Sequence, residues 1–332
     1  MEELLFDINE CKEETSMKKA LSVLTAAILL LCVGGAALAE GTVYRIGICQ
    51  LVQHVALDAA TQGFQDALKE KLGDAVTFDL QNASGESNNC STIMNTFVSG
   101  NVDLIMANAT PALQAAVAAT GDIPVLGTSV TDYATALDLS DWSGATGINV
   151  SGTSDLAPLD QQADMLQELF PEARNVGLIY CSAEPNSKYQ VDVIKGCLEE
   201  KGYTCTEYTF ADSNDVASVV QNACDGSDVL YVPTDNTAAS CTEAIRNVVE
   251  PAGVPVIAGE EGICKGCGVA TLSISYYDLG YTTGEMAYEV LVNNADISSM
   301  EVRFAPSVTK EYNAELCELF GIDIPEGYIA IE

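Results

Sequence analysis

The chain has 332 residues, of which 48 are acidic and 14 are basic, so its formal net charge at pH 7 is −34. A negative charge of this size repels nucleic acids and anionic lipid headgroups. No basic stripe interrupts it, so we exclude nucleic acid as a partner and interpret the acidity as a source of solubility outside the cell.

The amino-terminal residues predict export. Residues 17–39 begin with Met17-Lys18-Lys19, continue through an apolar run and end in Ala37-Leu38-Ala39, a pattern typical of a cleaved signal peptide. The apolar run is short for a transmembrane helix. Large leucines precede Cys32 where a lipidation motif has small residues, so a lipid anchor is disfavoured. We expect an extracytoplasmic protein, in the periplasm or at the outer face of the cell membrane.

Residues 1–16 do not fit this pattern, because they are acidic where a signal peptide is basic. Lys12-Glu13-Glu14 can be encoded by a ribosome-binding sequence that lies just before a start codon. We predict that residues 1–16 are an upstream extension that is not translated, and that synthesis begins at Met17.

Ten cysteines follow residue 39, and exported proteins can pair such cysteines in disulfides. Several lie in apolar strands, where cysteine acts as a small hydrophobic residue. Cys264-Lys265-Gly266-Cys267 is a CxxC sequence that suits a local disulfide about as well as two free thiols. Zinc is disfavoured, because a second ligand pair is missing and the single histidine, His54, is distant in sequence. We expect no metal and no cofactor.

Short apolar strands alternate with helical patterns along the whole chain. The first half predicts strands over 43–49, 76–80, 103–107 and 125–128, with helices over 57–72, around 91–98 and from Thr110. The second half predicts strands near 175–181, 203–209, 228–232, 254–258 and 269–275, with helices that begin near Asn186, Asp215, Thr237 and Asp278, then a strand over 302–305 and a helix from Asn313. Such alternation favours parallel sheets that are covered on both faces.

The second half of the chain repeats the first. Residues 103–110 (DLIMANAT) return as residues 228–236 (DVLYVPTDN), and 123–127 (IPVLG) return as 254–258 (VPVIA), at offsets of 125 to 131 residues. A duplicated unit predicts two similar lobes with a cleft between them. The predicted fold class is therefore α/β, with two Rossmann-like lobes built on parallel sheets and connected by hinges.

The tail after the second sheet predicts that both lobes are discontinuous. We assign residues 42–153 and 278–296 to the amino-terminal lobe and residues 154–277 and 297–332 to the carboxyl-terminal lobe. Hinges are expected near 151–156, 276–278 and 294–300.

Ligands of open parallel sheets bind beyond the carboxyl ends of the strands. The loops at these ends are rich in hydrogen-bonding groups: Gln50–His54, Asn108–Thr110, Thr128–Asp132, Ser182–Ser187, Pro233–Asn236 and Gly259–Glu261. Thr110 before Pro111 is a good helix N-cap, and the helix start would favour a carboxylate; the alternative is that Thr110 only caps the helix. Thr131-Asp132 offers a second such start. Asp235-Asn236 suits an ammonium group, although both are ordinary turn residues.

Nothing in the sequence favours an enzyme. The chain has no Ser-His-Asp order, no GxSxG elbow, no phosphate-binding loop and no dinucleotide fingerprint after its first strand. A single histidine such as His54 is more often a surface or capping residue than a catalyst. Glu260 and Glu261 are adjacent, so their side chains point in different directions and do not form an acid–base pair.

Several segments resemble one known family. They are Ile46–Gln50 with His54, Ala56–Ala59, Ala109–Ala112, Val130–Asp132, Asn186-Ser187, Tyr231–Thr237, Ala270–Leu272, Tyr276–Gly280 and Thr283–Ala287. Over about residues 42–325 the chain resembles the substrate-binding proteins of ABC transporters of the tryptophan and aromatic-amino-acid type, which have a type 1 periplasmic-binding-protein fold. Val55 and Tyr133 stand where the family commonly has proline, which bears on the identity of the ligand rather than on its class.

The resemblance implies a solute-binding protein that holds an amino-acid-like ligand, aromatic by family, between its lobes and delivers it to an ABC permease and its ATPase. We expect a monomer and no catalysis. The ligand-binding residues that we predict are Gln50, His54, Ala109, Thr110, Thr131, Asp132, Asn186, Ser187, Asp235, Asn236, Glu260 and Tyr276. One alternative is a binding protein for another small solute, a sugar or a nucleoside, that feeds a receptor; a secreted enzyme is a more distant one.

Overall fold

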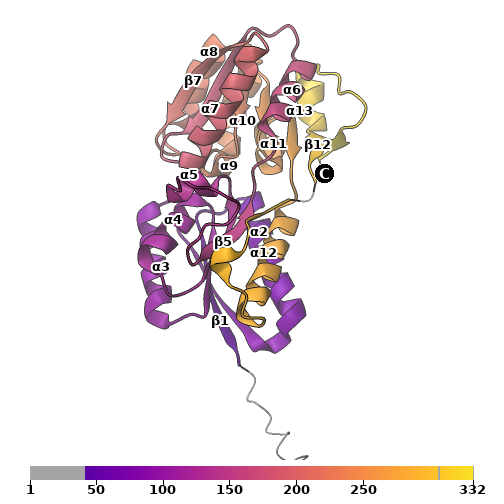
Figure 1. Cartoon of the computed structure of the whole chain (residues 1–332). Coiled ribbons are helices and arrows are strands. Elements are labelled where there is room, and N and C mark those ends of the chain that lie inside the picture. Colours follow the sequence, from indigo (N-terminus) through magenta and orange to yellow (C-terminus); the bar gives the residue numbers. More distant parts are fainter. Residues whose placement is uncertain (1–41, 306, 332) are drawn as a thin grey trace, which may run out of the picture. The chain divides into compact units, whose positions relative to one another are not determined.

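The structure is a computed structural model that describes residues 42–305 and 307–331. The predicted signal peptide over 17–39 and the predicted extension over 1–16 lie outside the described residues. The described strands form one sheet of six strands and one of seven, with helices between successive strands (Figure 1). The predicted α/β class with two sheets is confirmed. No helix in the described part of the chain is long and apolar enough to span a membrane.

The first sheet has the strand order β11-β5-β4-β3-β1-β2, and all of its strand pairs are parallel. Its strands are β1 (Tyr44–Gln50), β2 (Val76–Asn82), β3 (Leu104–Asn108), β4 (Val125–Val130), β5 (Val150–Ser154) and β11 (Arg303–Phe304). Its helices are α2 (Val55–Leu72), α3 (Ser87–Gly100), α4 (Thr110–Ala119), α5 (Tyr133–Leu137) and α12 (Tyr276–Leu291), with short 3₁₀ turns η1 (Gly73–Ala75) and η2 (Ile297–Ser299).

The second sheet has the strand order β13-β12-β10-β9-β8-β6-β7, and its β10–β12 pair alone is antiparallel. Its strands are β6 (Asn175–Cys181), β7 (Thr204–Phe210), β8 (Val229–Val232), β9 (Val256–Ala258), β10 (Ala270–Ser273), β12 (Thr309–Tyr312) and β13 (Ile329–Ala330). Its helices are α6 (Leu159–Leu169), α7 (Pro185–Glu200), α8 (Val216–Gly226), α9 (Asn236–Ser240), α10 (Thr242–Ala252), α11 (Glu261–Cys267) and α13 (Ala314–Phe320).

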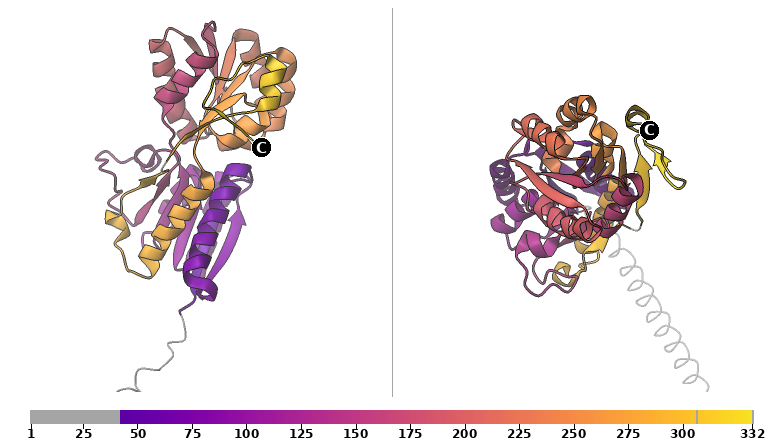
Figure 2. Two further views of the ribbon diagram at one scale, coloured as in Figure 1. Left: turned by 90° about the vertical axis from the view of Figure 1, so that its right-hand side faces the viewer. Right: turned by 90° about the horizontal axis from the view of Figure 1, so that it is seen from above.

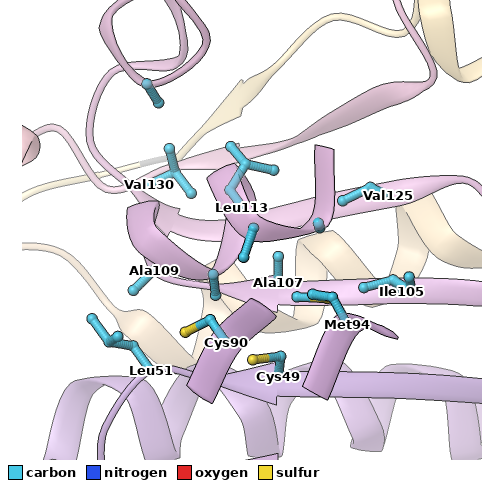
Figure 3. Close-up of a cluster of buried hydrophobic side chains, with 14 of the residues drawn as sticks. Cys49, Leu51, Cys90, Met94, Ile105, Ala107, Ala109, Leu113, Val125 and Val130 are labelled. Atoms are coloured by element: carbon cyan, nitrogen blue, oxygen red, sulfur yellow. The ribbon is translucent and has the colours of Figure 1, made fainter. Parts of the chain in front are cut away.

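Each sheet has a hydrophobic core on both of its faces, as continuous apolar strands require. In β3, Ile105 and Ala107 pack toward α3 and α4, whereas Leu104 and Met106 pack toward α2 and α12. Figure 3 shows the first of these cores, in which Cys49 of β1 lies beside Cys90 of α3. Both are free thiols, like the eight other cysteines of the described residues.

The aspartate that begins each copy of the sequence repeat has the same structural role in the two sheets. The Asp103 carboxylate accepts a hydrogen bond from the backbone N–H of Arg45 at 2.7 Å, just before β3. The Asp228 carboxylate accepts one from the N–H of Arg174 at 2.8 Å, just before β8. In both sheets an acidic side chain thus satisfies a backbone donor at the start of the neighbouring strand, which fixes where the two strands begin to pair.

Three connections join the two sheets, and they lie within the structural unit that covers residues 43–332. The chain leaves the first sheet after Ser154, returns after Ser273 and leaves again between Phe304 and Thr309. The sequence predicts the last transition at residue 297, and this boundary is wrong. Arg303 and Phe304 pair in parallel with β5, so β11 extends the first sheet. The predicted hinge over 151–156 also overlaps a strand, because β5 runs from Val150 to Ser154.

Helices α2 and α12 lie side by side against the first sheet (Figure 2). Their approach depends on glycine. A Cβ atom placed on Gly280 would lie 1.9 Å from the carbonyl oxygen of Ala60, and one on Gly63 would lie 2.1 Å from that of Tyr277. Since α12 follows the second connection, this tight contact holds the returning chain against the first sheet.

Candidate functional site

The predicted ligand-binding residues lie where the sequence places them, at the carboxyl ends of parallel strands or in the first turns of the helices that follow. All of them except His54 and Asp132 are buried. Burial obliges each polar atom to find a partner. The hydrogen bonds of each predicted site residue therefore show whether its side chain is held within the protein or has a polar atom left to bind a ligand.

Gln50 belongs to the framework. Its side-chain amide donates to the carbonyl oxygen of Val52 at 2.9 Å and to the Asp58 carboxylate at 2.7 Å. Its side-chain oxygen accepts a hydrogen bond from the Thr61 hydroxyl at 2.7 Å. These bonds hold the end of β1 against the first turns of α2 and leave Gln50 facing its own lobe.

The start of α4 differs from the predicted cap. Ala109, not Thr110, is the N-cap residue, and no side chain caps the helix. Ala109 has φ 91° and ψ 157°, a backbone conformation that costs a non-glycine residue about 1–3 kcal/mol and that gathers at functional sites. Thr110 is the first helical residue, and its buried hydroxyl has no hydrogen-bond partner. Pro111 lies in the first turn, as predicted.

The end of β4 offers a second unpartnered hydroxyl. Ser129 has φ 54°, and its buried Oγ makes no hydrogen bond. Thr131 is buried beside it, and Asp132 caps α5 by accepting a hydrogen bond from the backbone N–H of Thr135 at 2.7 Å. The predicted helix start at Thr131-Asp132 is therefore confirmed, with Asp132 in the capping role.

In the second lobe, Asp235 caps a helix and is fully engaged. One carboxylate oxygen accepts from the backbone N–H of Cys181 at 2.7 Å and the other from that of Ala238 at 2.8 Å. Burial, with a contribution from the charge of Glu184, raises the pKa of Asp235 to about 7. Each oxygen thus already accepts one backbone hydrogen bond, so the Asp235 carboxylate has less capacity for an ammonium group than the sequence suggests, and that role stays a prediction.

Glu184, which the sequence analysis does not single out, binds the start of the same helix through several hydrogen bonds. Its carboxylate accepts hydrogen bonds from the backbone N–H groups of Asn236 and Thr237 at 3.0 and 2.8 Å, and from the Asn236 amide at 2.7 Å. Asn186 donates to it as well, at 3.1 Å, and leaves its own Oδ1 without a partner. An acidic residue directly before the helix-starting Pro185 was the signal that could have found Glu184.

Glu260 of the second lobe and Tyr276, the first residue of α12, line the same side of the site. Glu260 caps α11 with both carboxylate oxygens, which accept from the N–H groups of Gly262 and Ile263 at 2.6 and 2.5 Å. Burial raises its pKa to about 7. Burial also raises the pKa of the Tyr276 phenol well above its usual range, so its neutral hydroxyl acts as a donor.

The acceptor of the Tyr276 hydroxyl is Asp155, a second residue that the sequence analysis does not single out. The bond to Asp155 Oδ2 is 3.0 Å long. Asp155 is 4% exposed, and its Oδ1 has no hydrogen-bond partner. Burial raises its pKa to about 6, against the effect of the neighbouring Thr131 and Tyr276 hydroxyls.

The two lobes meet in this region. His54 Nε2 of the first lobe lies 3.3 Å from Asn236 Oδ1 of the second. A hollow of about 280 Å³ lies beside this contact and is lined by Leu51, Ser84–Asn88 and Pro111 on one side and by Ala183-Glu184 and Asn236-Thr237 on the other. Among the described residues, no lysine or arginine lines it. A smaller hollow of about 200 Å³ is lined by Val55, Ala56, Glu260 and Tyr276.

In the part of the chain that the structure describes, the cysteines and the carboxylates do not assemble a metal centre. Within residues 42–305 and 307–331, no group of three or more histidine, cysteine, aspartate or glutamate side chains could hold a metal ion. Cys264 and Cys267 are free thiols in α11 rather than the local disulfide that the CxxC sequence allows. Their thiols donate to different backbone carbonyls, those of Gly268 and Ile263.

Comparisons with known proteins agree on one family. The model of the family described as ABC transporter substrate binding protein matches residues 45–329. A curated protein of Clostridioides difficile (strain R20291), described as a tyrosine-binding protein, is 40% identical over 250 residues, which are 74% of this chain and 72% of the relative.

Two solved structures extend the comparison. An ABC domain from Streptococcus pneumonia in complex with L-Trp is 31% identical and superposes with a TM-score of 0.83, covering 87% of this chain and 99% of the other. The ligand-free, open structure of a substrate-binding protein with adhesive properties from Clostridium difficile is 36% identical and covers the same shares. Its TM-score is only 0.67. The fold therefore superposes better on the tryptophan complex than on the open protein, although the sequence is more similar to the latter.

Proposed function

We propose that this chain, which belongs to the family of ABC transporter substrate-binding proteins, binds an aromatic amino acid between its two lobes as the solute-binding component of an importer. One observation carries the choice of site. Buried polar atoms without partners gather at the strand ends that the two lobes turn toward each other: His54 Nδ1, Thr110 Oγ1, Ser129 Oγ, Asp155 Oδ1 and Asn186 Oδ1. A buried polar atom without a partner costs about 1–3 kcal/mol, so a ligand that bonds to several of them stabilises this arrangement.

The start of α4 suits the carboxylate of an amino acid. The helix has ten residues and no side-chain cap, so its first N–H groups are available together with the Thr110 hydroxyl. These groups and the helix dipole favour a negative charge. Leu51 and Pro111 supply apolar surface in the adjoining hollow, where the side chain of the ligand would lie.

The choice of an aromatic amino acid rests on relatives. The curated relative is described as tyrosine-binding, and the structural relative with the higher TM-score holds L-Trp. The better superposition on the complex than on the open protein supports the idea that residues 43–332 are arranged here as in a ligand-bound, closed form. Binding would then shift the population of lobe arrangements from open to closed without making or breaking a covalent bond.

Membership of the family also supports the partners and the location. We propose that the closed form delivers its ligand to an ABC permease driven by an ATPase, and that the protein acts outside the cytoplasm as a monomer. Export would use the signal peptide at residues 17–39, and the mature chain would begin near Glu40.

Calorimetric titration of the mature protein tests this function. L-tryptophan, L-tyrosine and L-phenylalanine are titrated in parallel with L-leucine, glucose and adenosine, after unfolding and refolding to remove any bound ligand. We expect saturable binding of at least one aromatic amino acid and none of glucose or adenosine. Binding of the sugar or the nucleoside alone would contradict the proposal. Mass spectrometry of the ligand after incubation should show it chemically unchanged.

A further inference from the structure

Asp155 lies at the junction of the lobes. It follows β5 directly, at the start of the first connection, and its backbone N–H donates to the carbonyl oxygen of Val130 at 3.3 Å. Tyr276 is the first residue of α12, directly after the second connection. The 3.0 Å hydrogen bond from the Tyr276 hydroxyl to Asp155 Oδ2 therefore ties two of the three connections together.

Four buried carboxylates lie at the strand ends, and only one of them has an oxygen to spare. Both oxygens of Asp235, of Glu184 and of Glu260 accept hydrogen bonds from backbone or side-chain donors. Asp155 uses Oδ2 for Tyr276, and its Oδ1 is buried without a partner. Asp155 is thus the carboxylate in this group with an oxygen that accepts no hydrogen bond.

A positive charge near Asp155 would stabilise its ionised carboxylate. The titratable groups that act on it or respond to it are Glu184, Glu260, Tyr133 and Tyr276, which are either acidic or neutral phenols. None of the ion pairs found in the described part of the chain includes Asp155. A buried carboxylate without a cationic partner is unfavourable, and a cation that hydrogen-bonds to it removes much of that cost.

We propose that Asp155 Oδ1 binds the α-ammonium group of the amino-acid ligand, and that the Asp155–Tyr276 bond couples this contact to the connections between the lobes. This inference rests on the proposed function and deepens it, because it requires a zwitterionic ligand. The carboxylate of the ligand lies at the start of α4 and its ammonium lies at the end of β5. The ligand ammonium then gives Asp155 Oδ1 the hydrogen-bond partner that it lacks. The position of Asp155 itself depends on how the lobes are arranged.

The test compares L-tryptophan with indole-3-propionate, which has the same ring and carboxylate but no ammonium group. We expect wild-type protein to prefer L-tryptophan by at least about 100-fold, because only its ammonium group pairs with the buried Asp155 carboxylate. Asp155→Asn should lose most of this preference by weakening the binding of L-tryptophan alone. The matched control is Asp160→Asn, which makes the same change on an exposed residue five positions later and should bind both compounds like wild type.

The outcomes separate the two claims. If wild type binds neither L-tryptophan nor another aromatic amino acid, the proposed function fails. If wild type prefers L-tryptophan and Asp155→Asn keeps that preference, the function stands and this inference is overturned. Tyr276→Phe, which removes only the hydroxyl, should weaken L-tryptophan binding by up to about 10-fold and retain a preference for it.

A measurement on wild type keeps the test independent of whether Asp155→Asn folds. Below pH 6 a proton competes with the ligand for Asp155, so the affinity for L-tryptophan should fall with decreasing pH. The affinity for indole-3-propionate, which faces the same Glu184, Glu260, Tyr133 and Tyr276, should not fall in parallel. Equal pH dependence for the two compounds would overturn the inference.

Discussion

His54 and Asn236 join the two lobes through a single side-chain contact of 3.3 Å between Nε2 and Oδ1. Because the Asn236 amide nitrogen donates to Glu184, its oxygen faces His54 and must accept. Burial lowers the pKa of His54, so the ring is neutral at pH 7 and carries its proton on Nε2. The remaining nitrogen, Nδ1, is an acceptor, and it is one of the buried atoms without a partner.

The contact between the lobes predicts the effect of His54→Ala. Loss of one interlobe hydrogen bond should favour the open arrangement and raise the rate of ligand dissociation by up to about 10-fold. The free energy of unfolding should change little, since each lobe keeps its own core. Stopped-flow displacement of bound ligand measures the rate. Gln53→Ala, an exposed neighbour, is the control, and an unchanged rate in His54→Ala would mean that the contact does not stabilise the closed form.

Glu184 predicts a combined loss of stability and affinity. In Glu184→Gln an amide NH₂ group replaces one of the two carboxylate oxygens, so it must face the backbone N–H of either Asn236 or Thr237, each of which donates to its own oxygen of Glu184. We expect the free energy of unfolding to fall by about 1–3 kcal/mol, measured by urea denaturation, and ligand affinity to fall with it. Glu172→Gln, on an exposed residue, should leave both unchanged. A fully stable Glu184→Gln variant would show that this loop does not depend on the carboxylate.

The buried carboxyls predict an unusual dependence of stability on pH. The pKa values of Asp155, Asp235 and Glu260 are about 6, 7 and 7 in the folded protein, against about 4 in an unfolded chain. Between these values the folded state holds protons that the unfolded state has released, so the free energy of unfolding decreases as pH rises from about 4 to 7. The lowered pKa of His54 makes the free energy of unfolding rise with pH below 6.5, which is the opposite effect. This effect involves one proton, whereas the three carboxyls involve three.

Calorimetry of the ligand-free protein should therefore give a higher melting temperature at pH 5 than at pH 8. A melting temperature that rises over this interval would contradict the argument, since it would mean that the three carboxyls are ionised and well compensated in the folded state. A saturating ligand should reduce the difference, because its ammonium group stabilises the ionised form of Asp155.

The contact between α2 and α12 predicts opposite effects for two glycine-to-alanine changes. In Gly280→Ala the new methyl group would overlap the carbonyl oxygen of Ala60, so we expect a loss of about 1–3 kcal/mol or more in the free energy of unfolding. In Gly196→Ala, within α7, the new Cβ meets nothing within 4 Å and should stabilise the helix by about 0.5–1 kcal/mol. Urea denaturation of both variants checks this. Equal stability of the two would contradict the close approach of the helices.

Much of the fold follows from local patterns in the sequence. The apolar strands β1, β3, β6 and β8 lie where the sequence predicts them, because their residues are buried on both faces and read as continuous apolar runs. Strand β5 escapes prediction because its residues Val150–Ser154 are small and mostly polar. Its sheet position is decided by pairing with β4 and β11, which no local pattern reveals.

The site is harder to predict, because a residue's type does not show which partners it finds. Asp235 looks suited to an ammonium group, but each of its two carboxylate oxygens already accepts a backbone hydrogen bond. Thr110 looks like a cap, but α4 begins at Thr110 itself, one residue earlier than a Thr110 cap requires. Asp155 stands in a short polar stretch with no motif around it. Its free oxygen becomes visible only when Tyr276, 121 residues later in the chain, is found on the other oxygen.

A crystal structure of the mature protein with L-tryptophan tests the central claim most directly. We predict that the ligand lies between the lobes, with its ammonium nitrogen about 3 Å from Asp155 Oδ1 and its carboxylate at the Thr110 hydroxyl and the first N–H groups of α4. A ligand outside the cleft, or one whose ammonium nitrogen lies on another residue while Asp155 Oδ1 stays without a partner, would contradict it.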